Sequence, residues 1–230
     1  MRPHVICLMI TSVDGRVQTK RWMPKFDAAG AYERLHAELQ GDAWLVGRTT
    51  GEEFNERDDP YPAYTGAPIP REDWFAVERA DSWAVIMDAH GKIAWGTSEV
   101  SGDRIVVLLT RSVPDSHLAG LRADGVSYIF GGDDEIDLAS ALETLGTRLG
   151  IQKLLMEGGG HANGAMLGAG LIDELYLVVA PNIDGSRTSP SLFDVDDDQR
   201  KVAVKAMTLE GHQLLDGGMM LLRYRLTMST

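Results

Sequence analysis

Short apolar runs bounded by turn-forming or charged residues recur along the chain, and such runs predict buried strands. The first run is apolar throughout and is followed by an Asp-Gly turn pair, which is typical of a strand covered on both faces near the centre of a sheet. Before residue 160 the pattern predicts strands at Val5–Ile10, Ala43–Val46, Trp83–Met87, Ile105–Leu109, Val126–Phe130 and Leu154–Met156.

Apolar residues at helical spacing separate most of these strands. Asp27 and Asp137 are expected N-caps, and Pro114 with its following aspartate starts a further helix that stops near Gly125. The predicted helices are a segment with the stripe Tyr32, Leu35, His36 and Leu39, a short run Gly51–Phe54, the segment 114–125, a segment with Leu138, Ala141, Leu142, Leu145 and Leu149, and the segment His161–Leu171.

The C-terminal part of the chain has a different pattern. Glu174–Ala180, Val202–Leu209 and Met219–Leu226 are predicted strands with no helix between them, which favours antiparallel pairing, whereas the earlier alternation favours parallel neighbours with right-handed crossovers. We therefore predict an α/β fold in which residues 1–230 form a single domain. Its mixed sheet is mostly parallel, with antiparallel C-terminal strands and helices on both faces.

Residues 55–100 interrupt this regular pattern. Four prolines and two tyrosines fall between residues 55 and 73. Because proline lacks a backbone N–H and disfavours helix interiors, we expect a long ordered loop, an insertion or a lid there.

Composition and charge restrict the classes of function. The formal net charge of −12 and the pI near 4.9 argue against a nucleic-acid partner, because such proteins depend on basic surface to release counterions. No apolar stretch is long enough to span a membrane, and the first run is too short for a signal peptide core. The single cysteine, Cys7, lies in an apolar run, which indicates a packed thiol rather than a nucleophile and fits a reducing compartment. We expect a cytoplasmic protein that binds a small molecule and neither nucleic acid nor membrane.

Three predicted strand-to-helix junctions carry residues that suit a phosphate group. Backbone N–H groups at a helix start favour an anion, and glycines let it approach the backbone closely. Because such junctions share one edge of an open parallel sheet, all of them can serve one long nucleotide. A tight turn without a ligand is the alternative for the glycine triplet. The junctions are Gly47-Arg48-Thr49-Thr50, Thr110-Arg111-Ser112 and Gly158-Gly159-Gly160.

This set of turns resembles the dihydrofolate reductase superfold, in which a Gly-Arg-x-Thr turn, a Thr/Ser-Arg turn and a glycine-rich turn hold NADPH. More closely, the chain resembles the reductase domain of the bifunctional riboflavin-biosynthesis deaminase-reductases. The resemblance implies an NADPH-dependent reductase of a small heterocyclic or sugar-derived substrate that forms a homodimer. The motifs that carry it are Ser12-Val13-Asp14-Gly15-Arg16, Leu155-Met156-Glu157-Gly158-Gly159-Gly160 and Gly170–Tyr176 with Ala180-Pro181.

The resemblance also implies roles for the cofactor-binding junctions. Thr49 and Thr50, with the helix start after Gly47, are expected to serve the pyrophosphate, and the glycine triplet is expected to serve it from the other side. Arg111 is expected to bind the adenosine 2′-phosphate, because a guanidinium binds phosphate oxygens as a fork. A solvated surface arginine is the alternative.

The expected substrate side involves four residues. Asp14 and Glu157 are the candidate catalytic residues, and Ser12, Glu38 and Glu157 are expected to face the substrate. Glu157 follows a buried strand, so it is either a hydrogen-bond acceptor for the substrate or a carboxylate that caps its own glycine turn.

The expected substrate differs from that of the family. Its members usually carry a lysine in the first strand and an arginine on the helix before the second strand, and here Leu8 and Glu38 align with those places. A carboxylate repels a phosphate, so we predict a substrate without a phosphoribosyl group. A shift of one helical turn would bring Arg34 to the second place instead.

Two further functions remain open. A dihydrofolate reductase proper would use Glu33 or Glu38 as the acidic residue on its first long helix, and a nucleotide-binding protein would lack turnover altogether. No metal site is predicted, because the six histidines are scattered and the acidic group at Asp194 and 196–198 lacks the glycine and closing glutamate of a calcium loop. The antiparallel strands at the end of the chain would leave an open edge, which favours the homodimer.

Overall fold

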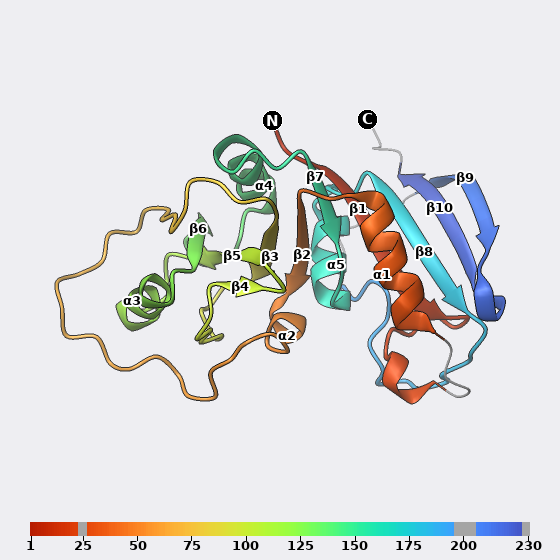
Figure 1. The fold of residues 1–230 in the computed structure, drawn as a ribbon, viewed down its shortest axis with the longest axis horizontal. Helices are drawn as coiled ribbons and strands as arrows, with labels where there is room; N and C mark the ends of the chain where they lie inside the picture. Colours follow the sequence, from red (N-terminus) through yellow and green to blue (C-terminus); the bar gives the residue numbers. More distant parts are fainter. Residues whose placement is uncertain (23–26, 196–205, 227–230) are drawn as a thin grey trace. The chain divides into compact units, whose positions relative to one another are not determined.

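The computed structural model describes residues 1–22, 27–195 and 206–226. Contacts cluster into two compact units, one of Met1–Pro3 and Asp42–Gln152 and the other of His4–Gly41 and Lys153–Thr230. Both units have parallel strands with helices beside them, and an antiparallel pair comes at the C-terminal end of the chain (Figure 1). The predicted mixed α/β fold is confirmed. The assignment of residues 1–230 to one domain stays a prediction.

The first unit contains a mostly parallel sheet. Its elements are β2 (Ala43–Gly47), α2 (Arg48–Gly51), β3 (Trp83–Met87), β4 (Glu99–Val100), β5 (Asp103–Thr110), α3 (Asp115–Asp124), β6 (Ser127–Gly132) and α4 (Leu138–Arg148). Strands β2, β3, β5 and β6 pair in that order and all run parallel, while β4 pairs antiparallel with β5. The carboxyl ends of the four parallel strands therefore lie along one edge of this sheet.

Local signals in the sequence account for the helices of this unit. The side chain of Asp137 caps α4 by accepting a hydrogen bond from the backbone N–H of Ser140 at 3.1 Å. Gly125 ends α3 with a φ of 72°, which glycine adopts without a steric cost. Helix α2 begins at Arg48, earlier than the run predicted from Gly51, because the backbone turns helical directly after β2.

Residues 55–82 form one long loop of this unit without helices, and Figure 1 shows the loop running around α3. An isolated bridge joins Trp74 to Tyr128 of β6, with backbone hydrogen bonds of 3.0 and 2.9 Å and stacked rings whose centroids lie 6.0 Å apart. The rest of the interval from 55 to 100 holds β3 and β4. The prolines thus fall in an ordered loop that is held against α3 and β6.

The second unit is built on the central strand predicted from the first apolar run. Its elements are β1 (His4–Ser12), α1 (Ala28–Leu39), β7 (Lys153–Met156), α5 (Gly160–Gly168), β8 (Glu174–Ala180), β9 (Met207–Leu214) and β10 (Met220–Leu226), with short 3-10 turns at Thr19–Arg21 and Asp216–Gly218. Strand β1 lies between β7 and β8, parallel to both, and β10 and β9 continue the sheet antiparallel.

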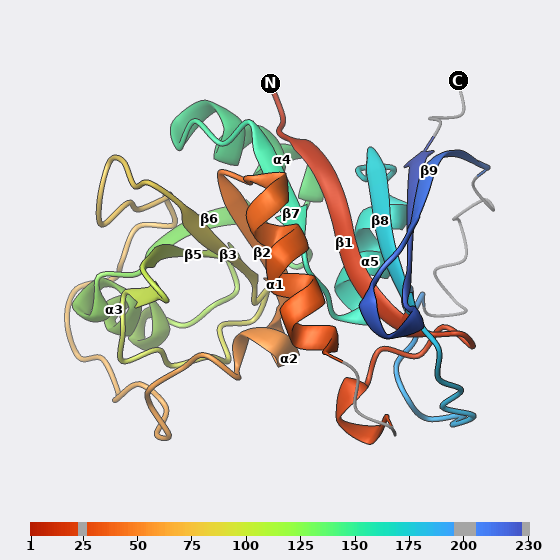
Figure 2. The ribbon, with the colours of Figure 1, turned by 45° about the vertical axis from the view of Figure 1, so that its right-hand side comes forward.

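Helix α1 packs on one face of this sheet and α5 lies on the other (Figure 2). The core under α1 joins Ala31 and Leu35 of the helix to Leu8 of β1 and Val178 of β8. Asp27 caps α1 by accepting a hydrogen bond from the N–H of Gly30 at 3.1 Å, as predicted.

Two sequence predictions fall in this unit, a strand and a packed thiol. Strand β9 begins at Met207, later than the strand predicted at Val202–Leu209, whose first residues lie outside the described part of the chain. Cys7 is fully buried in β1, and burial raises the pKa of its thiol to about 12, which agrees with a packed thiol. None of the helices in the described ranges is long and apolar enough to cross a membrane.

Candidate functional site

Two of the three predicted phosphate junctions lie at the carboxyl edge of the first unit's sheet. Gly47 ends β2, and Thr110 ends β5. The backbone N–H and the hydroxyl of Thr110 both donate to the carbonyl of Ala89, at 2.9 and 2.7 Å, and Ala89 follows β3 between those two strands. The structure therefore brings Gly47–Thr50 and Thr110–Ser112 to a common edge, as expected for parallel strands.

A pocket of about 630 Å³ opens at this edge, and a pocket of this volume can accommodate a large part of a nucleotide. Arg48 comes from the predicted junction, while Lys92 and His90 come from the loop after β3. Arg48 forms an ion pair with Glu52 one helical turn further on. The lining residues are Arg48, Glu52, Met87, Asp88, Ala89, His90 and Lys92.

Asp88 shapes the loop that carries Lys92. Its Oδ2 accepts hydrogen bonds from the backbone N–H groups of Lys92 and Ile93, at 2.7 and 2.8 Å, and its Oδ1 has no hydrogen-bond partner among the described residues. The side chain is buried, and this burial raises the pKa of the carboxyl. Sequence reasoning missed Asp88 and Lys92; an aspartate directly after a buried strand was the available signal.

The groups at this edge that can meet a phosphate are side chains rather than a helix dipole, and a phosphate at Arg48 would take the place of Glu52. Helix α2 has a single turn, so its dipole adds little. Arg48 and Thr49 are exposed and Thr50 is half-buried, so their side chains can meet a ligand. The hydroxyl of Thr110 is buried and already bonded to Ala89 and Ser112, so this residue shapes the edge from within.

Arg111 lies on the surface beside this edge. Its guanidinium pairs with Asp133 at 3.1 Å, and the side chains of the two residues are 46% and 82% exposed. The ring centroid of Phe130 lies 6.0 Å from the guanidinium carbon. Because exposed ion pairs contribute little, a phosphate can take the place of Asp133 at small cost. Both alternatives for Arg111 therefore stand.

The glycine turn belongs to the second unit, and each of its glycines has an internal structural reason. Gly158 and Gly159 have φ angles of 118° and 75°, which side-chain-bearing residues rarely adopt. A side chain at Gly160 would collide with the carbonyl of Ser191 and with the carboxylate of Asp194. Phosphate binding by this turn stays a prediction, since the tight turn alone accounts for the glycines.

Glu157 forms a close contact with α1. Its carboxylate lies 2.6 Å from Nδ1 of His36, and its side chain is only 11% exposed. Tyr32 lies one helical turn before His36; burial raises the pKa of its hydroxyl well above the usual value, and the charge of Glu157 raises it further. The partner of Glu157 is thus an imidazole from α1, which neither alternative from the sequence included.

The Ser12–Arg16 turn is also closed by internal hydrogen bonds. Ser12 is buried, and its hydroxyl donates to Asp14 at 2.7 Å. Asp14 also accepts from the backbone N–H groups of Asp184 and Gly185, at 3.0 and 2.8 Å. These hydrogen bonds, led by that from Ser12, hold the pKa of Asp14 well below its ordinary value. Asp14 is therefore better suited to hold the turn than to donate a proton.

Of the residues that suggested a changed substrate, Leu8 lies next to Glu157 along the sheet, because each directly follows a residue of the registered pair Cys7 and Met156. Leu8 is fully buried under α1, and Glu38 is exposed on the helix, two positions from His36. Arg34 is exposed as well and pairs with Asp27 at 3.3 Å. Residues two apart point to different sides of a helix, so the position that meets Glu157 is His36. The sequence signal was present, because Tyr32 and His36 belong to one helical stripe.

Within the described ranges, no three His, Cys, Asp or Glu side chains lie close enough together to hold a metal ion. Of the acidic group considered for calcium, Asp194 accepts hydrogen bonds from the N–H and the hydroxyl of Ser191. Its other members, residues 196–198, lie outside the described residues.

Known proteins resemble this chain over most of its length. A 2,5-diamino-6-ribosylamino-4(3H)-pyrimidinone 5′-phosphate reductase from Methanothermobacter thermautotrophicus is 28% identical over 84% of this chain and 85% of that protein. The enzyme of the same name from Archaeoglobus fulgidus is 25% identical over 89% of this chain and 92% of that protein. The crystal structure of a pyrimidine reductase-like protein from Corynebacterium diphtheriae matches with a TM-score of 0.74 at 21% identity, covering 99% of this chain and 93% of that one.

The family assignment rests on a family model that matches nearly the whole chain. The model of the RibD C-terminal domain matches residues 3–221. This range includes the Ser12–Arg16 turn, both junctions of the first unit and the glycine turn. The chain therefore belongs to the RibD C-terminal domain family, the reductases of the riboflavin pathway.

Proposed function

We propose that this protein is an NADPH-dependent reductase that acts on a C=N or C=O group of a small heterocyclic or sugar-derived compound. The observation that carries the proposal is the pocket at the carboxyl edge of the first unit, where Arg48 and Lys92 offer two cations beside the Thr110–Ser112 turn. The family supports it, since its curated relatives are named as reductases of a ribosylaminopyrimidinone phosphate.

Each group at this edge has a distinct role. NADPH, when bound, supplies the hydride. Arg48 and Lys92 neutralise phosphate charge, and Thr49 and Thr50 donate hydrogen bonds to it. Arg111 binds the 2′-phosphate in place of Asp133, which gives the preference for NADPH over NADH.

Glu157 and His36 act on the substrate. The carboxylate accepts hydrogen bonds from ring or exocyclic N–H groups of a heterocycle, and His36 fixes the carboxylate orientation from α1. Because His36 belongs to α1 and Glu157 directly follows β7, the acceptor is held before substrate arrives. The proton that completes the reduction can come from water, so no further acid is required of these residues.

A substrate without a phosphoribosyl group is a second candidate. It rests on Leu8 and Glu38, which align with the lysine and the arginine usual in the family and offer no positive charge to a phosphate. Dihydrofolate is the third substrate to test. Glu33 and Glu38, which would serve it, are both exposed on α1.

A panel of three compounds distinguishes these possibilities by the consumption of NADPH. It contains the pyrimidinone 5′-phosphate named for the relatives, the same riboside without phosphate, and dihydrofolate. Turnover of the phosphate above about 1 per second would show that the phosphoribosyl group is accepted. NADPH binding without turnover of any compound in the panel would favour a binding protein.

We also propose a homodimer formed along strand β9. In the described part of the chain, β9 pairs only with β10, so its outer edge offers unpaired backbone groups. Met207, Leu209 and Leu214 of this strand are 45%, 51% and 69% exposed. Light scattering should give the mass of a dimer for the unchanged chain and of a monomer for Leu209→Lys. A monomeric mass for the unchanged chain would exclude this assembly.

The cytoplasmic location of the protein stays a prediction.

A further inference from the structure

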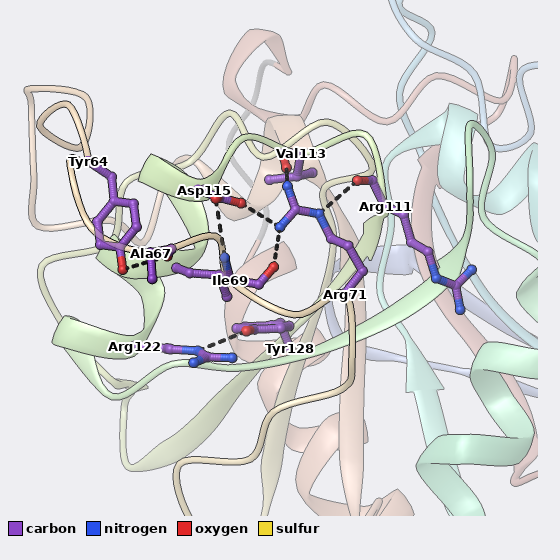
Figure 3. Close-up of polar contacts among 9 residues, drawn as sticks. All are labelled: Tyr64, Ala67, Ile69, Arg71, Arg111, Val113, Asp115, Arg122 and Tyr128. Carbon is purple, nitrogen blue, oxygen red and sulfur yellow. Dashed lines mark hydrogen bonds and ion pairs between the residues drawn. The ribbon is translucent and has the colours of Figure 1, made fainter.

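Arg71, in the long loop 55–82, inserts its guanidinium into the turn between β5 and α3 (Figure 3). Nε donates to the carbonyl of Arg111 at 3.1 Å, and Nη2 donates to the carbonyl of Val113 at 3.0 Å. Nη1 reaches both the carbonyl of Ile69 and the carboxylate of Asp115, at 2.8 and 2.5 Å. One side chain thus ties the loop to both sides of the turn.

The contacts fix the backbone of Arg111 at both of its polar groups. Its N–H donates to the carbonyl of Gly132 at 2.8 Å, and its carbonyl is held by Arg71. The N–H of Ile69 donates to the second oxygen of Asp115 at 3.2 Å, which closes the connection between loop and helix start. In Figure 3 the side chain of Arg111 points away from the guanidinium of Arg71.

We propose that Arg71 is a positioning residue for cofactor choice: it holds the Arg111–Asp115 turn so that the Arg111 guanidinium is presented to the 2′-phosphate of NADPH. This inference rests on the proposed NADPH-dependent activity. It assigns a role to the long loop, whose function the sequence does not reveal.

Arg71 acts through the turn rather than on the phosphate itself. All three of its guanidinium nitrogens already donate to protein oxygens, and its carboxylate partner neutralises its charge. Both members of this pair are about a third exposed or less, at 32% and 29%. The Arg111 guanidinium, by contrast, pairs with an exposed carboxylate that a phosphate can replace. Fixing the backbone lowers the conformational entropy that Arg111 would lose when it binds a phosphate.

Arg122 of α3 offers a matched control, because it contacts the same loop. Its Nε donates to the hydroxyl of Tyr128 at 2.9 Å, and its guanidinium lies over the rings of Trp74 and Tyr128, at 5.6 and 5.7 Å from their centroids. It therefore anchors the loop through Trp74, without a contact to the Arg111–Asp115 turn among the described interactions. A variant here loosens the loop and leaves the turn in place.

The experiment measures dissociation constants of NADPH and NADH for the unchanged protein, Arg71→Gln and Arg122→Gln. Adenosine 2′,5′-bisphosphate and adenosine 5′-phosphate are measured in parallel, since they differ only in the 2′-phosphate. We expect Arg71→Gln to lower the preference for the 2′-phosphate about tenfold, with NADH affinity unchanged, and Arg122→Gln to keep the preference. If Arg71→Gln does not fold, Arg71→Lys takes its place, with a smaller loss in the same direction.

The outcomes separate this inference from the proposed function. Three outcomes would overturn the role of Arg71 alone. They are a retained preference for NADPH in the folded Arg71 variant, an equal loss of affinity for NADPH and NADH in that variant, and an equal loss of the preference in Arg122→Gln. Equal affinity of the unchanged protein for NADPH and NADH would overturn both proposals. A loss of preference confined to the Arg71 variant supports the inference.

Discussion

The carboxylate of Glu157 and the Nδ1 atom of His36 lie 2.6 Å apart, although 121 positions separate the two residues in the chain. Glu157 follows β7 and His36 belongs to α1, so the contact exists only when α1 packs on the sheet of the second unit. The pair is the most specific feature of the proposed substrate side.

Replacing either member of this pair should separate substrate binding from cofactor binding. Glu157→Gln removes the charge of the side chain but keeps its shape. We expect the variant to lower kcat/KM by a factor that corresponds to about 1.5 to 3 kcal/mol, the usual contribution of a charged hydrogen bond. The dissociation constant of NADPH should stay unchanged. His36→Gln keeps a donor and should have a smaller effect. Steady-state kinetics and direct NADPH titration provide the test, and equal activity of Glu157→Gln and the unchanged enzyme would exclude the role.

Arg111→Ala should reduce the preference for NADPH over NADH. The loss should be about 1.5 to 3 kcal/mol, because one charged hydrogen-bond donor to the 2′-phosphate disappears. Asp133→Asn is the matched control: it frees Arg111 from its partner, so NADPH should bind at least as well as before. If Arg111→Ala still prefers NADPH over NADH as strongly as the unchanged protein does, another residue binds the 2′-phosphate.

The glycine turn can be tested with a substitution in the turn and one at a glycine outside it. Gly159 and Gly150 both have positive φ angles, of 75° and 72°, so alanine at either place should destabilise the fold, by at least about 1 kcal/mol. If Gly159 also borders a phosphate, only Gly159→Ala should weaken NADPH binding of the folded protein, by about tenfold or more. Unchanged NADPH affinity in both variants would leave the tight turn as the sole role of the glycines. Urea unfolding and NADPH titration measure the two effects.

Stability should fall on mild acidification because His117 is buried as the neutral imidazole. Burial, assisted by the charge of Lys92, lowers its pKa from 6.5 to about 4. Between these values the unfolded chain binds a proton that the folded chain does not, so stability is lost as pH falls from about 6.5 toward 4. The loss between pH 7 and pH 5 should be about 2 kcal/mol.

The variant His117→Phe should reduce this pH dependence. It keeps an aromatic ring against Tyr61, whose centroid lies 5.1 Å from that of His117. His161, with 83% of its side chain exposed, serves as control, and His161→Gln should leave the pH dependence unchanged. Urea unfolding at both pH values measures the difference. An identical decline in His117→Phe would assign the acid sensitivity to other groups.

Local signals in the sequence were enough to predict the fold class and most elements. The apolar run in β1 produced a strand covered on both faces, since a continuous run cannot expose one side of a strand to water. Asp27 and Asp137 cap their helices and Gly125 ends α3, because caps and left-handed turns depend on a few neighbouring residues. The common edge of the Gly47 and Thr110 junctions follows from parallel strand order alone.

Only the tertiary structure decided which side chains meet. Spacing identified Tyr32 and His36 as one stripe of a helix, but the partner of that stripe depends on how α1 lies on the sheet. The same holds for Arg71, since a loop without periodic pattern gives no signal of what it packs against. Contacts between residues far apart in the chain are set by packing and long-range pairing, whereas the periodic pattern of a sequence records only which face of an element is buried.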